Sequence, residues 1–201
     1  MSTVLLHLPY FPNVYWLKQF ITADKVVIEH CENFVKGSYR NRCEIAGPNG
    51  RQLLSIPVTG GRDHHQVYRE VAISYESDWQ KNHWQSIKAA YGSAPYFEHY
   101  DYKLKALFTE QGEFLFAHNL QVLNTVLKLL KLSADFALTE TYEQVTAGIN
   151  DLRKTKQIEE CFLPPRYYQV FEERHGFMRN LSVLDLLFNL GPRSMDYLRD
   201  I

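Results

Sequence analysis

A group of cationic side chains lies at residues 34–45, which read FVKGSYRNRCEI. Side chains of an extended chain alternate between two faces, so Lys36, Arg40 and Arg42 would share one face. Guanidinium groups bind phosphate or carboxylate through paired hydrogen bonds, and a lysine adds a point charge. The spacing therefore predicts a site for a small anionic ligand, such as a sugar nucleotide or a carboxylate. The alternative is a strand face exposed to water, with Glu44 as an ion-pair partner.

A second candidate group lies on a helix that is predicted to follow Asp78. At about 100° per residue, this helix has one apolar stripe. The stripe and its edge contain Trp79, His83, Trp84, Ile87, Lys88 and Tyr91. His83 has the side chain best suited to acid–base catalysis near neutral pH. The alternative is a hydrogen-bonded histidine of the core, with Lys88 at the rim of the apolar surface.

A third candidate is the segment HLPYFP at residues 7–12, between the first predicted strand and a short helix. Loops of this kind expose backbone N–H groups at a helix N-terminus, where a ligand can bind. The sequence contains no GxSxG, Walker or GxGxxG motif. The serine hydrolase, P-loop and dinucleotide-binding classes therefore have no local support.

Two kinds of element must position these groups. Residues up to about 75 show short β-rich runs, and later residues show helical spacing. Strands are expected at 3–8, 25–29, 39–46, 52–58 and 67–73, with a hairpin turn at GPNG (47–50), and helices at 14–20, 78–91, 93–108, 113–131, 166–175 and 182–190. We therefore expect one α/β domain over residues 1–201, with a small mixed sheet in the N-terminal half and a helical C-terminal half. The alternative class is α+β.

Composition limits the classes of partner. The 201 residues include 22 Lys and Arg against 23 Asp and Glu, so the formal net charge is −1. A charge so close to zero argues against bulk nucleic acid or an anionic membrane as partner. The absence of a run of about 18 apolar residues and of a signal-peptide pattern predicts a cytoplasmic protein without a membrane span. Three cysteines without CxxC or HExxH spacing predict reduced thiols and no metal or other cofactor. The oligomeric state is left open.

Several motifs together carry a family resemblance. They are PYFP at 9–12, FVK at 34–36, YRNRCEI at 39–45, IPV at 56–58, AYG at 90–92, APYF at 94–97 and LDLLFNLGP at 184–192. In these motifs, and over nearly its whole length, the chain resembles the WbqC-like protein family. Several family members have a glutamine where this chain has His7. The resemblance therefore gives no reason to treat His7 as a catalytic residue of the family.

The resemblance implies a role in the synthesis of O-antigen and other surface polysaccharides. Members are suggested to transfer glycine or a similar acyl group to an amino sugar, and the implied activity is such a transferase. In that reading, His83 is catalytic and takes a proton from the attacking amine. The implied substrate-binding residues are Lys36, Tyr39, Arg40, Arg42, Trp84, Lys88, Tyr91, Asp185 and Asn189. Because the cationic segment lies within a shared motif, the resemblance favours anion binding over an exposed strand face.

Two other functions compete with transfer. One is a non-catalytic module that recognises an anionic ligand, a glycan or a partner protein through its aromatic surface. The other is a nucleotidyltransferase-like protein, suggested by His7 and Pro9, although a second histidine is missing from the expected loop. Binding that survives loss of His83 would favour the module.

Overall fold

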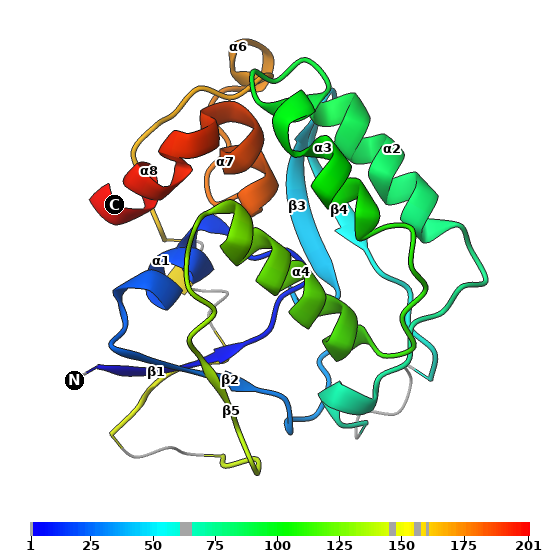
Figure 1. Ribbon diagram of the computed structural model, residues 1–201, viewed down its shortest axis with the longest axis vertical. Coiled ribbons are helices and arrows are strands. Elements are labelled where there is room, and N and C mark those ends of the chain that lie inside the picture. The colour runs from blue at the N-terminus through cyan, green and yellow to red at the C-terminus, as the bar shows by residue number, and fades with distance from the viewer. Residues whose placement is uncertain (1, 61–65, 145–147, 155–157, 160) are drawn as a thin grey trace.

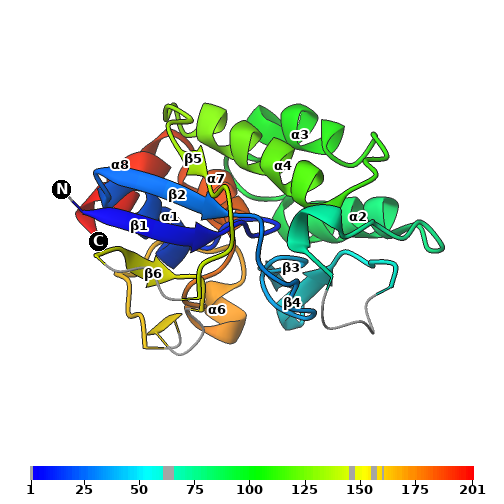
Figure 2. The same cartoon turned by 90° about the horizontal axis from the view of Figure 1, so that it is seen from below.

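Four short parallel strands form one sheet (Figures 1 and 2). The computed structural model describes residues 2–60, 66–144, 148–154, 158–159 and 161–201. The strands are β1 (Thr3–His7), β2 (Lys25–Glu29), β5 (Ala137–Leu138) and β6 (Asn150–Leu152), in the spatial order β5-β2-β1-β6. Leu5 of β1 lies opposite Val27 of β2 and Asp151 of β6. Strand β1 is thus central, which explains its nearly continuous apolar sequence.

Helix α1 (Val14–Thr22) connects β1 to β2, because parallel neighbours need a crossover. Asn13 caps its first turn, where the side-chain oxygen accepts a hydrogen bond from the Trp16 amide at 2.9 Å. The Trp16 indole donates in turn to the His7 carbonyl at 2.8 Å. These two bonds fix the end of β1 relative to the start of α1.

A separate antiparallel hairpin is formed by β3 (Arg42–Gly47) and β4 (Gly50–Ser55). Gly50 follows the two-residue loop with a φ of 102°, a region that favours glycine. The hairpin expected from the GPNG sequence is therefore confirmed. Strand β3 packs against helix α2 (Trp79–Tyr91).

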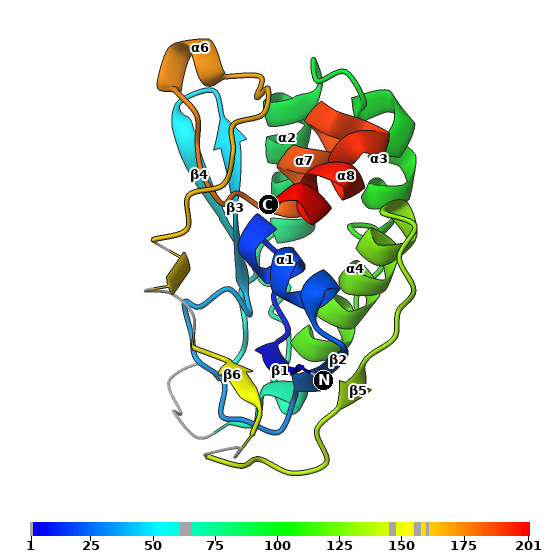
Figure 3. The same ribbon diagram turned by 90° about the vertical axis from the view of Figure 1, so that its left-hand side faces the viewer.

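The remaining helices build most of the apolar core. They are α3 (Phe97–Ala106), α4 (Leu115–Leu129), α6 (Glu172–His175), α7 (Val183–Leu190) and α8 (Ser194–Asp200), with 3-10 turns at Tyr68–Glu70 and Gly191–Arg193. Every residue of α7 is buried. Figure 3 shows the hairpin along one side of the molecule and helices α2, α3, α4, α7 and α8 on the other. Within the described parts of the chain, no helix combines the length and apolar character needed to cross a bilayer.

The observed architecture confirms the expected class, with a parallel sheet and a small antiparallel sheet in the N-terminal half and helices in the C-terminal half. The detail differs at residues 67–73, which were expected to form a strand. Val67, Ala72 and Ile73 make only isolated β-bridges, and a 3-10 turn lies between them. Strand β6 (Asn150–Leu152), by contrast, lies outside every strand that was expected from the sequence.

Candidate functional site

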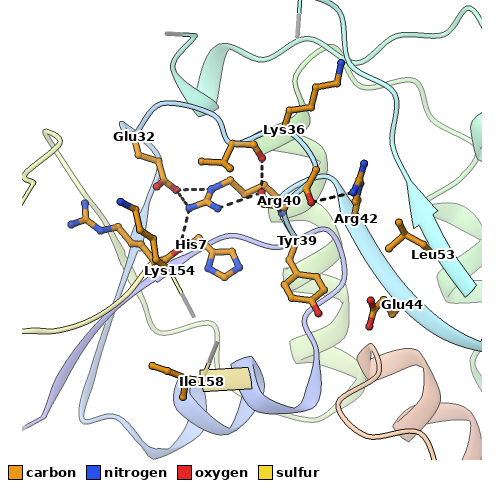
Figure 4. A pocket seen from close by; sticks show the side chains of 14 residues that line it. His7, Glu32, Lys36, Tyr39, Arg40, Arg42, Glu44, Leu53, Lys154 and Ile158 are labelled. Atoms are coloured by element: carbon orange, nitrogen blue, oxygen red, sulfur yellow. Dashed lines mark hydrogen bonds and ion pairs between the residues drawn. The ribbon is translucent and has the colours of Figure 1, made fainter. Parts of the chain in front are cut away.

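A pocket of about 670 Å³ lies at the carboxyl ends of β1 and β6 (Figure 4). Its lining comes from the end of β1, the β2–β3 loop, the hairpin and the segment after β6. The lining residues are His7, Glu32, Val35, Lys36, Gly37, Ser38, Tyr39, Arg40, Arg42, Glu44, Leu53, Arg153, Lys154 and Ile158. The chain proceeds from β1 outward to β2 and β5 and then places β6 on the other side of β1. Open parallel sheets bind ligands at such a reversal of strand order.

The loop between β2 and β3 turns back on itself beside the pocket. Gly37 has a φ of 78°, and Ser38 Oγ donates to the Val35 carbonyl at 2.6 Å. Arg42 Nη1 donates to the Gly37 carbonyl at 3.2 Å, and a Cβ on this glycine would lie 3.1 Å from that nitrogen. The extended conformation expected for this segment is therefore wrong, because a glycine turn replaces the strand until Arg42. The turn, rather than strand alternation, brings the cations to the pocket.

Arg40 is held in a buried ion pair with Glu32. Its Nε and Nη2 donate to Glu32 Oε1 at 2.7 and 2.5 Å, and the two side chains are only 5% and 8% exposed. Burial raises the pKa of the Glu32 carboxyl, and the Arg40 charge and hydrogen bonds oppose that rise. Arg40 Nη2 also donates to the Arg153 carbonyl at 3.3 Å, and the Arg40 carbonyl accepts from Asn119 at 2.6 Å. Arg40 thus joins the loop to α4 and to the end of β6.

Arg153 is a second buried arginine whose charge is already matched. Its Nη1 donates to Glu29 at 3.1 Å and its Nη2 to Asp151 at 2.5 Å. The guanidinium also lies over the Tyr142 ring, 5.1 Å from its centroid. The hydrogen bonds with Asp151 raise the pKa of Arg153 further above its usual range. Arg153 therefore contributes a fixed positive charge behind the pocket.

Three other cations of the lining have no such partner. Among the described residues, no carboxylate lies within 4.0 Å of the charged nitrogens of Lys36, Arg42 or Lys154, here called the unpaired cations. Arg42 is half-buried, and its Nε has no hydrogen-bond partner in the described parts of the chain. In Figure 4, Arg42 and Lys154 lie on opposite sides of the pocket, and Lys36 extends away from Arg40. These cations are available to an anionic ligand.

The rim of the pocket is apolar. Val35, Leu53 and Ile158 line it and are 50%, 48% and 50% exposed. Glu44, which also lines the pocket, forms an ion pair with Arg51. Exposed aliphatic side chains next to convergent cations are typical of sites for ligands that join a charged group to a less polar body.

His7 is the last residue of β1 and lines the pocket, and the residue is 4% exposed. Burial, and then the nearby Arg40 charge, lower its pKa to about 3, while a hydrogen bond with the Leu152 carbonyl opposes the fall. The ring is therefore neutral at pH 7. Its Nδ1 has no hydrogen-bond partner among the described residues.

His83 lies outside this lining, on α2. Its Nδ1 is 3.1 Å from the Tyr10 hydroxyl, and its ring packs edge-on against Trp79. Burial lowers the pKa of His83 to about 4, and a hydrogen bond with the backbone of Ser55 partly opposes this fall. The structure therefore places His83 in the hydrogen-bonded core position that was the alternative to a catalytic role.

The neighbouring site candidates on α2 also face elsewhere. Trp84 stacks on Phe97 at 6.1 Å and packs on Phe108 at 5.8 Å, both measured between ring centroids. Lys88 is exposed in the last turn of the helix. Neither residue lines the pocket that holds Lys36, Tyr39, Arg40 and Arg42.

The remaining candidates are parts of the buried core between α2 and α7. The Tyr91 hydroxyl accepts a hydrogen bond from the Ala46 amide at 3.1 Å. Asp185 Oδ2 accepts from the Tyr167 hydroxyl at 2.7 Å, and burial raises the pKa of this carboxyl to about 6. Asn189 donates to the Asp185 carbonyl at 2.8 Å. The pocket therefore unites four of the ten predicted site residues, and the other six lie outside its lining.

Sequence reasoning did not assign Glu32, Arg153 or Lys154 to a site. The two cations follow β6, whose three residues include polar Asn150 and Asp151 and show no strand alternation. His7 lies in the third candidate segment, for which the sequence suggested ligand contacts by the backbone of the loop. No signal in the sequence indicated that the His7 side chain lines a pocket. No group of three His, Cys, Asp or Glu side chains arranged to hold a metal ion occurs within the described residues.

Comparison with known proteins gives one family and one relative. A sequence profile of the WbqC-like protein family matches residues 9–162. This range includes every lining residue of the pocket except His7. A protein of Mycobacterium tuberculosis, described as Uncharacterized protein Rv1507c, is 29% identical over 218 residues, covering 94% of this chain and 91% of the relative. No solved structure matches the chain.

Proposed function

This chain belongs to the WbqC-like protein family, and we propose that it binds an anionic small molecule in the pocket at the ends of β1 and β6. The ligand class is a compound with phosphate or carboxylate groups, such as a sugar nucleotide. One observation carries the proposal: the unpaired cations Lys36, Arg42 and Lys154 line a pocket at the point where open parallel sheets bind ligands.

The charges of the lining support an anion rather than a neutral ligand. The lining has five lysines and arginines and two glutamates. When the ion-pair partners Glu29 and Asp151 of Arg153 and Arg51 of Glu44 are included, an excess of two positive charges remains. Because Arg40 and Arg153 are held by carboxylates, the ligand's direct contacts are assigned to the unpaired cations. Arg42 supplies the planar fork that binds an anion with two hydrogen bonds, and the lysines add mobile point charges.

The apolar rim supports a ligand larger than a simple anion. A pocket of about 670 Å³ lies within the range of small-molecule sites. The exposed aliphatic side chains at Val35, Leu53 and Ile158 offer contact to a sugar ring or a base while the anionic groups meet the cations. A sugar nucleotide combines these two parts.

Transfer of an acyl or aminoacyl group to an amino sugar, the reaction that the family resemblance implies, is the second candidate function. It needs a base that reaches the bound ligand, and His83 lies outside the lining. The family match supports this candidate, but His7, the one imidazole among the described lining residues, has a pKa lowered to about 3 by burial and is therefore too weak a base for that step. If the candidate is correct, mixing the protein with an amino-sugar nucleotide and an activated glycine gives a new product mass, and Arg42→Ala greatly reduces it.

Calorimetric titration tests the binding proposal directly. The probes are UDP-N-acetylglucosamine, inorganic pyrophosphate and neutral N-acetylglucosamine. We expect the two anions to bind and the neutral sugar to give no heat. Arg42→Ala should weaken UDP-N-acetylglucosamine binding roughly 10–100-fold, the loss typical of a hydrogen bond with a charged group. The exposed Lys36→Ala should cost less, about 2–5-fold.

Lys88→Ala is the matched control, because this exposed lysine lies on α2 outside the pocket. Its affinity for UDP-N-acetylglucosamine should equal that of the unaltered protein. Equal losses for Arg42→Ala and Lys88→Ala, or binding of the neutral sugar as tight as that of the anions, would refute the proposed function.

A further inference from the structure

The His7 ring combines two properties that are rarely found together. The residue is 4% exposed, and its Nδ1 is a buried polar atom without a hydrogen-bond partner among the described residues. Buried polar groups are nearly always paired, because a lone one loses its contact with water and gains nothing in return. Eight buried side-chain atoms among the described residues lack a partner, and two of them, His7 Nδ1 and Arg42 Nε, belong to residues that line the pocket, where a ligand can supply the missing partner.

The surroundings of the ring determine what Nδ1 offers to that ligand. Burial, and then the nearby Arg40 charge, lower the pKa of the ring to about 3, so at pH 7 it holds one proton and one of its nitrogens is an unprotonated acceptor. Nδ1 has no hydrogen-bond partner among the described residues. The tautomer with the proton on Nε2 leaves the lone pair of Nδ1 free for a ligand. A second proton is disfavoured because the Arg40 guanidinium lies close to the ring (Figure 4).

We propose that His7 carries its proton on Nε2 and that Nδ1 accepts a hydrogen bond from an O–H or N–H group of the anion that Arg42 and Lys154 bind. The inference rests on the proposed function and narrows its ligand class. The ligand carries a hydroxyl or amino group beside its anionic group, as a sugar phosphate does. An alkyl phosphate without such a group lacks one of the contacts that the pocket provides. The unpaired cations recognise the charge, and His7 recognises the donor.

The tautomer can be tested without any ligand. Long-range ¹H–¹⁵N spectra of protein with labelled histidine distinguish a protonated from an unprotonated ring nitrogen. At pH 7 we expect His7 to show a protonated Nε2 and an unprotonated Nδ1. A proton on Nδ1, or on both nitrogens, would overturn the inference, because the ring would then have no lone pair to offer at Nδ1.

The hydrogen bond itself can be tested with a matched pair of ligands. Glucose 6-phosphate and cyclohexylmethyl phosphate share a six-membered ring, a methylene and a phosphate, but only the first has hydroxyl groups. We expect His7→Phe to weaken glucose 6-phosphate binding about tenfold and to leave cyclohexylmethyl phosphate within about twofold. His7→Gln, which keeps an acceptor and a donor, should restore most of the glucose 6-phosphate affinity. His99→Phe, an exposed histidine on α3, should change neither affinity.

The outcomes separate this inference from the proposed function. If neither phosphate binds the unaltered protein, or if Arg42→Ala changes neither affinity, the proposed function fails and this inference fails with it. If both phosphates bind through Arg42 and His7→Phe affects them equally or not at all, the pocket still binds anions and the His7 inference alone is wrong. If His7→Phe does not fold, the ring spectrum and the His7→Gln titrations decide the matter. A proton on Nδ1 contradicts the inference, and so does a His7→Gln variant that binds glucose 6-phosphate no better than cyclohexylmethyl phosphate.

Discussion

Replacing Glu32 with alanine removes the carboxylate that holds Arg40 beside the pocket. The two side chains are 8% and 5% exposed, and the carboxylate accepts hydrogen bonds from two nitrogens of the guanidinium. Loss of one partner from a buried ion pair leaves an uncompensated charge, which costs about 3–5 kcal/mol. We therefore expect Glu32→Ala to lower the free energy of unfolding by this amount, measured by urea denaturation at pH 7.

The pair itself need not stabilise the fold. Burial raises the pKa of Glu32 despite the adjacent Arg40 charge, which indicates that loss of hydration outweighs the attraction. The double variant Glu32→Leu with Arg40→Leu removes both charges and keeps apolar volume. It should recover most of the stability that Glu32→Ala loses.

The ion pair of Glu44 and Arg51 provides the control. Its side chains are 24% and 41% exposed, so water already solvates both charges. Glu44→Ala should lower stability by about 0–1 kcal/mol. The reasoning about burial is refuted if Glu32→Ala costs no more than Glu44→Ala, or if the double variant is less stable than Glu32→Ala.

Two further predictions concern backbone and pH. Gly37→Ala should weaken UDP-N-acetylglucosamine binding by displacing Arg42, whose Nη1 would lie 3.1 Å from the new Cβ. Gly148→Ala is the control, because Gly148 has a similar φ of 74° but open space around it, and this variant should affect stability alone. Equal affinities of the two variants in calorimetry would contradict this prediction. Burial lowers the pKa of His118 to about 4, below its unfolded value, so protonation of the unfolded chain should destabilise the protein as pH falls below about 6.5. His118→Phe should reduce the stability lost between pH 7 and pH 5 by roughly 1–2 kcal/mol in urea denaturation, and an unchanged loss would contradict the assignment.

The sequence revealed the cationic part of the site because charge and composition are local properties. Lys36, Arg40 and Arg42 lie close together in the chain, and the turn at Gly37 brings them to one pocket even though the expected extended conformation does not occur. Lys154 escaped notice because its position depends on β6, which pairs with β1 across about 145 residues of sequence.

The helical candidates show the limit of periodicity. Spacing correctly predicted a helix from Trp79 to Tyr91 and placed His83 and Tyr91 on its apolar stripe. A stripe identifies the face that is buried but gives no information on whether a cavity adjoins that face. In this fold the stripe packs against β3 and the aromatic core, where His83 lies 3.1 Å from the Tyr10 hydroxyl and Tyr91 accepts a hydrogen bond from the Ala46 amide.

Chemical-shift mapping with UDP-N-acetylglucosamine tests the central claim most directly. Backbone amide signals report where an anion binds, independently of any variant. We predict that the largest shifts fall on Gly37, Arg42 and Lys154, around the pocket at the ends of β1 and β6. Shifts concentrated instead around Lys88 on α2, with the pocket residues unchanged, would contradict the account.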